Sequence, residues 1–71
     1  MSKYAFEKGY GQVTINEAET VKNEIMSVLN ITTRQSWLRR LSGKVEPKAS
    51  EKDAIEEVFR KRGIINVFNN S

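Results

Sequence analysis

Residues 29–43 of the chain read LNITTRQSWLRRLSG. Asn30 tolerates the left-handed backbone that ends many helices, so we expect one helix to end just before it. Gly43 suits the same left-handed position, and it predicts the end of a second helix over residues 34–41. The cap of that second helix is one of two threonines, Thr32 or Thr33. The stretch therefore predicts two helices joined by a very short turn, in which Ile31 points back into the core.

The residues before this turn predict a helix from about Glu17 to Leu29. Its apolar residues recur at i, i+4, i+7 and i+8, which places them on one face of a helix. These residues are Val21, Ile25, Val28 and Leu29. Two capping schemes stay open at its start: Thr14 with Glu17 three residues on, or Asn16 with Glu19 three residues on.

Beyond Gly43, residues 44–49 contain the single proline of the chain and predict a loop. Ser50 then predicts the cap of a third helix, with Asp53 three residues later. The apolar stripe of this helix consists of Ala54, Ile55, Val58 and Phe59. Gly63 followed by Ile64 is typical of a Schellman ending, in which the Ile64 side chain packs back onto the helix.

The two ends of the chain are less regular. Residues 10–15 alternate loosely and include three β-branched residues, which favours either a short extended strand or a frayed tail. Residues 65–68 are apolar enough to pack on the body, beside residues 10–15. We therefore predict a mainly α, compact three-helix domain containing a helix-turn-helix, with short extended segments at its two ends. Its parts are an extended or flexible arm over residues 1–15, a helical domain over residues 16–68, and a disordered tail over residues 69–71.

The composition excludes several classes of function. The chain has no cysteine and no histidine, so disulfides, thiolate metal sites and the usual general base are absent. Glu56 and Glu57 are adjacent and diverge on a helix, so they form no catalytic pair. We therefore expect no enzyme, no metal, no cofactor and no small-molecule substrate. No apolar run approaches the ~20 residues of a membrane span, and no signal-peptide core is present, so we expect a cytoplasmic protein.

Positive charge is concentrated in the middle of the chain. The whole chain carries a net charge of +3, whereas residues 32–48 contain five cations against one anion, a net +4. On a helical wheel of residues 34–41, the apolar cluster is Trp37, Leu38 and Leu41. The opposite side carries Gln35, Ser36, Arg39 and Arg40. Arg pairs with guanine, Gln with adenine and Ser with several acceptors, so these side chains suit the reading of base edges.

The residues that flank this helix suit phosphate contacts. Thr33 offers its hydroxyl and nearby free N–H groups at a helix N-terminus, which favours an anion. Lys44 and Lys48 lie just beyond the helix and can touch the same strand. Because no acidic residue interrupts residues 34–41, nothing on this helix repels phosphate.

From residue 21 to residue 64 the chain resembles the lambda-repressor/Cro-like helix-turn-helix family. The resemblance is carried by LNITTRQ at residues 29–35, by SGKVEP at residues 42–47, and by a capped helix that ends RGI at residues 62–64. The whole string also looks like short uncharacterised proteins of Bacteroides-type bacteria and their mobile elements. In the helix-turn-helix family the second helix enters the major groove.

The resemblance implies sequence-specific binding of double-stranded DNA, by a small transcriptional regulator or a mobile-element accessory protein. The implied base contacts are Arg34, Gln35, Ser36, Arg39 and Arg40. The implied phosphate contacts are Thr33, Lys44 and Lys48. Such a small footprint usually needs a homodimer on paired half-sites.

Two alternatives stay open. The apolar residues Ile64, Ile65, Val67 and Phe68 either form the dimer contact or close the core of the monomer. The protein is either the DNA binder described above or a protein-interaction module, an adaptor or antitoxin-like partner, whose Arg39 and Arg40 meet an acidic protein surface. Binding of structured RNA is a third and weaker option, because no RNA-module signature is present.

Overall fold

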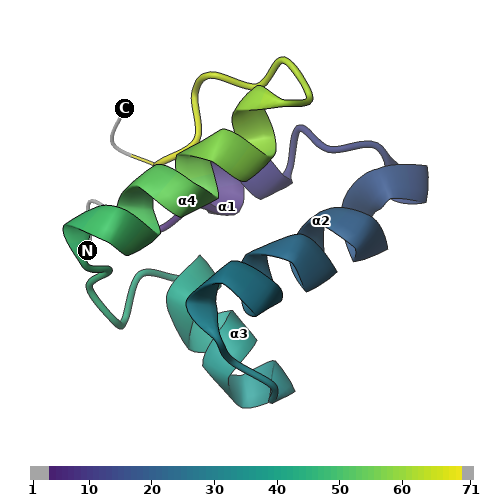
Figure 1. Ribbon diagram of the computed structural model, residues 1–71. Coiled ribbons are helices and arrows are strands. Elements are labelled where there is room, and N and C mark those ends of the chain that lie inside the picture. The colour runs from purple at the N-terminus through teal and green to yellow at the C-terminus, as the bar shows by residue number, and fades with distance from the viewer. Residues whose placement is uncertain (1–3, 70–71) are drawn as a thin grey trace.

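Four helices make up the secondary structure of residues 4–69, the part of the chain that the computed structural model describes (Figure 1). They are α1 (Glu7–Tyr10), α2 (Ile15–Leu29), α3 (Arg34–Leu41) and α4 (Ala49–Arg60). This confirms a mainly α domain. Within the described range no residue is in a strand, and no helix combines the length and apolar character needed to cross a bilayer.

The three longer helices end in the same way. Asn30, Gly43 and Gly63 follow α2, α3 and α4, with left-handed φ values of 58°, 80° and 77°. After α4, the Gly63 N–H donates to the Arg60 carbonyl at 3.0 Å and the Ile64 N–H to the Phe59 carbonyl at 3.1 Å, the two bonds of a Schellman motif. The same pair of bonds closes α2 and α3. The predicted left-handed residue is thus confirmed at all three helix ends.

The helix starts agree with the sequence analysis less uniformly. Thr33 caps α3, because its Oγ1 accepts a hydrogen bond from the Ser36 N–H at 3.1 Å. Thr14 is the N-cap residue of α2, although its side chain makes no capping bond to the backbone. The predicted cap of α4, Ser50, is wrong. The N-cap residue is Lys48, so the helix starts two residues earlier than predicted, and the Glu51 carboxylate accepts a hydrogen bond from the Lys48 N–H at 3.0 Å.

Of the two alternatives for residues 10–15, a short strand or a frayed tail, the strand does not form. Tyr10 is the last residue of α1, residues 11–13 form a turn, and Ile15 opens α2. A single helical turn forms instead because Phe6 and Tyr10 are four residues apart and therefore share one face. Both rings pack edge-on against Trp37, with centroid distances of 5.7 Å for Phe6 and 5.3 Å for Tyr10.

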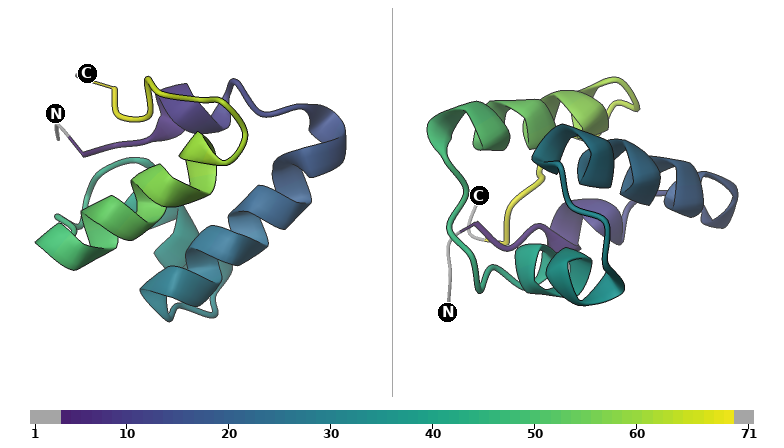
Figure 2. Two further views of the ribbon diagram at one scale, coloured as in Figure 1. Left: turned by 45° about the horizontal axis from the view of Figure 1, so that its top comes forward. Right: turned by 60° about the horizontal axis from the view of Figure 1, so that its bottom comes forward.

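Phe6 lies at the centre of the core with a relative exposure of 1%. Besides Trp37 of α3, its ring contacts Phe59 of α4, with 6.3 Å between ring centroids. Its backbone N–H donates to the carbonyl of Leu41, at the end of α3, at 3.1 Å. The N-terminal segment therefore joins α3 to α4, although the two helices lie on opposite sides of the molecule (Figure 2).

The C-terminal tail runs beside the N-terminal segment. Gly9 donates to the Val67 carbonyl at 2.9 Å, and Asn69 donates to the Ala5 carbonyl at 2.8 Å. Val67 and Phe68 are buried, so the expectation that the tail packs on the body is confirmed. The disorder predicted for Asn69 is wrong, while residues 1–3 and 70–71, which the predicted arm and tail include, lie outside the described residues.

Two apolar residues that the sequence pattern placed in the core are half exposed instead. Val28 of α2 and Leu38 of α3 each have a relative exposure of 45%. Each lies next to the buried face of its helix. The buried residues of α2 are Val21, Ile25 and Leu29, and the buried residue of α3 is Trp37. The predicted stripe of α4 is largely confirmed, since Ile55, Val58 and Phe59 are buried.

Charged side chains reinforce the packing of α2 against α4. The Arg62 guanidinium, just beyond α4, lies 2.5 Å from the Glu24 carboxylate and 3.5 Å from that of Glu17, both on α2. Lys61 adds a longer ion pair to Glu24 at 3.6 Å. The hydrogen bond from Arg62 lowers the pKa of Glu24 from its ordinary value, and the positive charges of Arg62 and Lys61 lower it further.

Gly9→Ala should lower the free energy of unfolding by about 1–3 kcal/mol. A Cβ at this position would lie 2.9 Å from the Val67 carbonyl oxygen and 3.0 Å from its Cα, and a buried backbone cannot yield to it cheaply. Gly11→Ala is the matched control. Its φ is −67°, and its added Cβ would meet only the Glu7 and Lys8 carbonyls, at 3.2 and 3.8 Å. Chemical denaturation of both variants tests this, and equal stabilities would contradict the close approach of the tail.

Acid should destabilise the fold partly through Glu24. Its pKa is lower in the folded state than in the unfolded chain, so its contribution is complete above the ordinary value of 4.5 and is lost as the pH falls through the folded pKa. Glu24→Gln should therefore flatten the dependence of unfolding free energy on pH below 4.5. Denaturation at a series of pH values measures this slope. A variant that retains the full wild-type slope would show that Glu24 does not contribute to the pH dependence of stability.

Candidate nucleic-acid interface

The outer face of α3 is the surface that lies opposite its buried side. Trp37 is 4% exposed and Leu41 packs partly buried against the core, and together they define the inner face. Since Gln35 and Arg39 are four residues apart, they share a face, and helical geometry places it about opposite Trp37. Both are exposed. Gln35 and Arg39 therefore lie next to each other on the exposed face of α3.

The structure separates the five predicted base contacts into two groups. Arg34, Gln35 and Arg39 are exposed. Ser36 is half-buried, and its hydroxyl oxygen accepts a hydrogen bond from the Thr33 hydroxyl at 2.9 Å. Arg40 is directed toward α4, where its guanidinium lies 3.0 Å from the Glu51 carboxylate. The first three remain available to a ligand, whereas Ser36 and Arg40 are engaged within the protein.

Arg40 and Glu51 connect the end of α3 to the start of α4. Their side chains are only 16% and 20% exposed, so the pair is partly shielded from water. The Glu51 carboxylate also accepts the N–H of Lys48, and this bond, followed by the bond from Arg40, lowers the pKa of Glu51. Arg40 therefore has a structural task that the sequence did not reveal, because its partner is reached only through the fold.

The three predicted phosphate contacts also differ in their surroundings. The Thr33 hydroxyl accepts from the Ser36 N–H and donates to the Ser36 hydroxyl, so it is occupied within its own cap. The side chains of Lys44 and Lys48 are exposed. Lys44 follows the left-handed Gly43 directly, and Lys48 precedes the first residue of α4. The side chains of Lys44 and Lys48 are therefore open to a phosphate, whereas the Thr33 hydroxyl is already hydrogen-bonded within the protein.

Some cations of the described range form ion pairs with carboxylates and others do not. Arg40 of α3 is paired with Glu51. The cations of α4 and the two residues after it all form ion pairs: Lys52, Arg60, Lys61 and Arg62. A second set forms no ion pair with any residue from 4 to 69, and four of its members lie on α3 and the loop that follows it: Arg34, Arg39, Lys44 and Lys48. Unpaired positive charge is therefore gathered around α3.

A shallow hollow of about 400 Å³ lies on this face. Its wall is built by α3, the residues after it and one residue of α1: Glu7, Gln35, Leu38, Arg39, Leu41, Ser42 and Lys44. Sequence reasoning missed Ser42 and Glu7 here. Ser42 could have been found, because it lies seven residues after Gln35 and so on the same helix face. Glu7 carried no such signal, because α1 reaches the hollow only through the tertiary fold.

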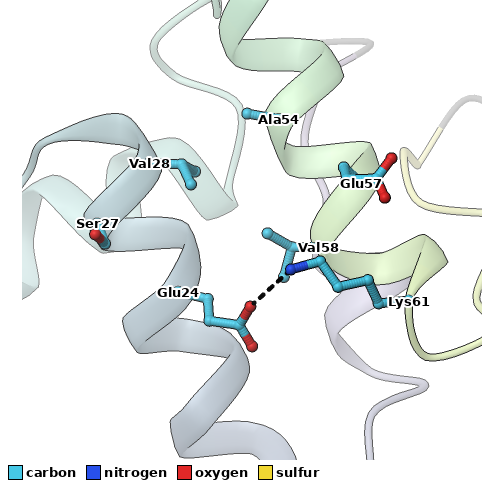
Figure 3. Close-up of a pocket in the computed structure, with 7 residues that line it drawn as sticks. All are labelled: Glu24, Ser27, Val28, Ala54, Glu57, Val58 and Lys61. Carbon is cyan, nitrogen blue, oxygen red and sulfur yellow. Dashed lines mark ion pairs between the residues drawn. The ribbon is translucent and has the colours of Figure 1, made fainter.

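A second groove, of about 370 Å³, lies between α2 and α4 (Figure 3). Val28 and Val58 face it from the two helices, and Glu24 forms its ion pair with Lys61 across it. Glu57 on the rim is itself paired to Arg60. Two carboxylates and no unpaired cation line this groove, so its charge does not suit phosphate. Among the two hollows, that of α3 is the candidate site.

No protein-family model matches the chain, and neither the curated proteins nor the solved structures contain a match to it. The resemblance to the lambda-repressor/Cro-like family therefore stays a prediction. The structure does place α2 and α3 in succession, joined through residues 30–33. The most extensive contact of α2, however, is with α4 and not with α3. Within residues 4–69 no group of acidic side chains is placed to hold a metal ion.

Arg40→Ala should destabilise the protein by about 1 kcal/mol, because it removes a partly buried ion pair and leaves Glu51 without one partner. Arg39→Ala, one residue earlier on the exposed face, should change the stability by less than about 0.5 kcal/mol. Thermal and chemical denaturation of the two variants gives the comparison. If both arginines prove equally dispensable for stability, the assignment of Arg40 to the fold is wrong.

Proposed function

We propose that this protein binds double-stranded DNA with the outer face of α3 and the loop that follows it. The observation that carries the proposal is a set of four exposed, unpaired cations, two on a helix without acidic residues and two in the loop that follows it. Two of them, Arg39 and Lys44, line one hollow together with the exposed Gln35. Phosphate contacts provide most of the affinity of such proteins, and base contacts add the sequence preference. Both kinds of side chain are present on this one face.

The dimensions of α3 suit the major groove of DNA. An α-helix with its side chains is about 10–12 Å across, and the major groove of B-DNA is about 12 Å wide. With α3 in the groove, Gln35 and Arg39 face the base edges. Arg34, Lys44 and Lys48 are placed before and after them along the chain, where they can contact the phosphates on either side.

The acidic residues support the same orientation. Glu17 and Glu24 on α2 are held by Arg62, and Glu57 is held by Arg60. These groups belong to the packing of α2 and α4, whereas α3 lies on the side of the molecule opposite α4 (Figure 2). Glu7 is the one carboxylate in the wall of the α3 hollow. Glu46 is also exposed, in the loop between Lys44 and Lys48, so DNA approaching α3 meets four unpaired cations and two carboxylates.

The biological role that we propose is that of a small sequence-specific regulator or mobile-element accessory protein. Because α3 has only eight residues, few base contacts are available to one copy, and two copies on paired half-sites would extend the footprint. The apolar tail does not offer the contact between copies. Ile64, Val67 and Phe68 are buried in the monomer, and only Ile65, at 80%, is largely exposed.

A protein-interaction module is the second candidate, because the exposed Leu38 adds an apolar contact to the arginines of the same face. The two functions differ in their dependence on salt. DNA binding releases condensed counterions, and the three proposed phosphate contacts predict a slope of log K against log salt of about −3. A protein partner has no such counterion layer to release.

Titration of a labelled random-sequence duplex at several salt concentrations tests the proposed function. Lys44→Ala should weaken binding and reduce the magnitude of the salt slope by about one, because Lys44 is one of the proposed phosphate contacts. Arg60→Ala is the charge-matched control, since it removes an exposed arginine from α4, and it should leave the slope almost unchanged. Absence of salt-dependent binding by the wild-type protein, or equal losses in the two variants, would overturn the proposal.

A further inference from the structure

Leu38 is an apolar residue on an otherwise polar face. Its relative exposure is 45%, although its neighbour Trp37 is 4% exposed. It takes part in the wall of the α3 hollow together with Gln35 and Arg39. The fold covers only part of the leucine side chain, so nearly half of its apolar surface is open to a ligand at this hollow.

The major groove of DNA displays one apolar group, the 5-methyl group of thymine. We propose that Leu38 contacts this methyl group when α3 lies in the groove, so that the protein favours A·T pairs at this position. This inference rests on the proposed function, because it requires α3 to meet the base edges. It adds a specificity residue that polar base-reading patterns do not include.

Gln35, three residues before Leu38, can read the adenine of the same A·T pair. Residues three apart on a helix have Cβ atoms about 5–6 Å from each other, so Gln35 and Leu38 can reach the same or adjacent base pairs. An amide side chain bonds the N6 and N7 edge of adenine, and the thymine opposite that adenine carries the methyl group. The two side chains thus complement the two bases of an A·T pair, one by hydrogen bonds and the other by apolar contact.

Uracil provides the direct test, because it pairs as thymine does and lacks only the methyl group. The probes are a short duplex of alternating adenine and thymine and the same duplex with uracil in place of every thymine. Wild-type protein should bind the thymine duplex about fourfold more tightly, the factor that corresponds to about 0.8 kcal/mol for one buried methyl group. Leu38→Ala should bind the two duplexes almost equally, because the shortened side chain no longer reaches the methyl group.

Two further variants distinguish a contact by Leu38 from other effects of the substitution. Leu38→Met keeps a long apolar side chain and should retain the preference for thymine. Arg39→Ala should weaken binding to both duplexes and leave their ratio unchanged. Circular dichroism and thermal unfolding establish that each variant is folded before binding is measured.

The possible failures are separable. If the wild-type protein binds neither these duplexes nor the random-sequence duplex in a salt-dependent way, the proposed function fails and the inference fails with it. If it binds both duplexes with normal salt dependence and equal affinity, DNA binding stands and the role of Leu38 is overturned. A preference for thymine that persists in Leu38→Ala would likewise overturn it, and would assign the preference to the shape of the duplex.

Discussion

The packing of Phe6 between Trp37 and Phe59 is the constraint on which the rest of the structure depends. These two aromatic rings belong to α3 and α4, and Phe6 contacts both. Without a side chain in this position, α3 would lose its principal apolar attachment to the pair formed by α2 and α4. Gly9, one turn later, lets the backbone of Val67 approach closely, so the tail covers the same segment. The fold is thus closed by its two chain ends.

This arrangement also determines which side of α3 meets the solvent. Trp37 and Leu41 must face Phe6 and the core, so Gln35 and Arg39 must face away. The Schellman ending at Gly43 and the ion pair of Arg40 with Glu51 then fix where the loop leaves the helix. The exposed face of α3 is therefore held from behind, and a ligand does not have to order it on binding, which lowers the entropic cost of association.

The sequence predicted the features that depend on local chemistry. The left-handed residues Asn30, Gly43 and Gly63 mark the ends of three helices because few other residues tolerate that conformation, and the bounds of α3 followed from them. The features that depend on distant partners could not be predicted. The single helical turn of α1 is too short to show a hydrophobic pattern in the sequence. The residues that bury Phe6, and the residue that pairs with Arg40, are distant in sequence and are brought close only by the fold.

The same distinction applies to the candidate site. The outward position of Gln35 and Arg39 follows from helical periodicity, and both could be named from sequence. Arg34 shares the face of Trp37 and Leu41 and is exposed as the first residue of α3, while the removal of Arg40 from the set required the fold. Arg40, Lys61 and Arg62 form ion pairs that join one element to another, whereas the pairs of Lys52 and Arg60 lie within α4. Substitution of the exposed, unpaired cations of α3 and its loop should change the stability little. The charges that join the elements are thus different from those exposed on α3, so substitutions on the outer face of α3 should leave the fold intact.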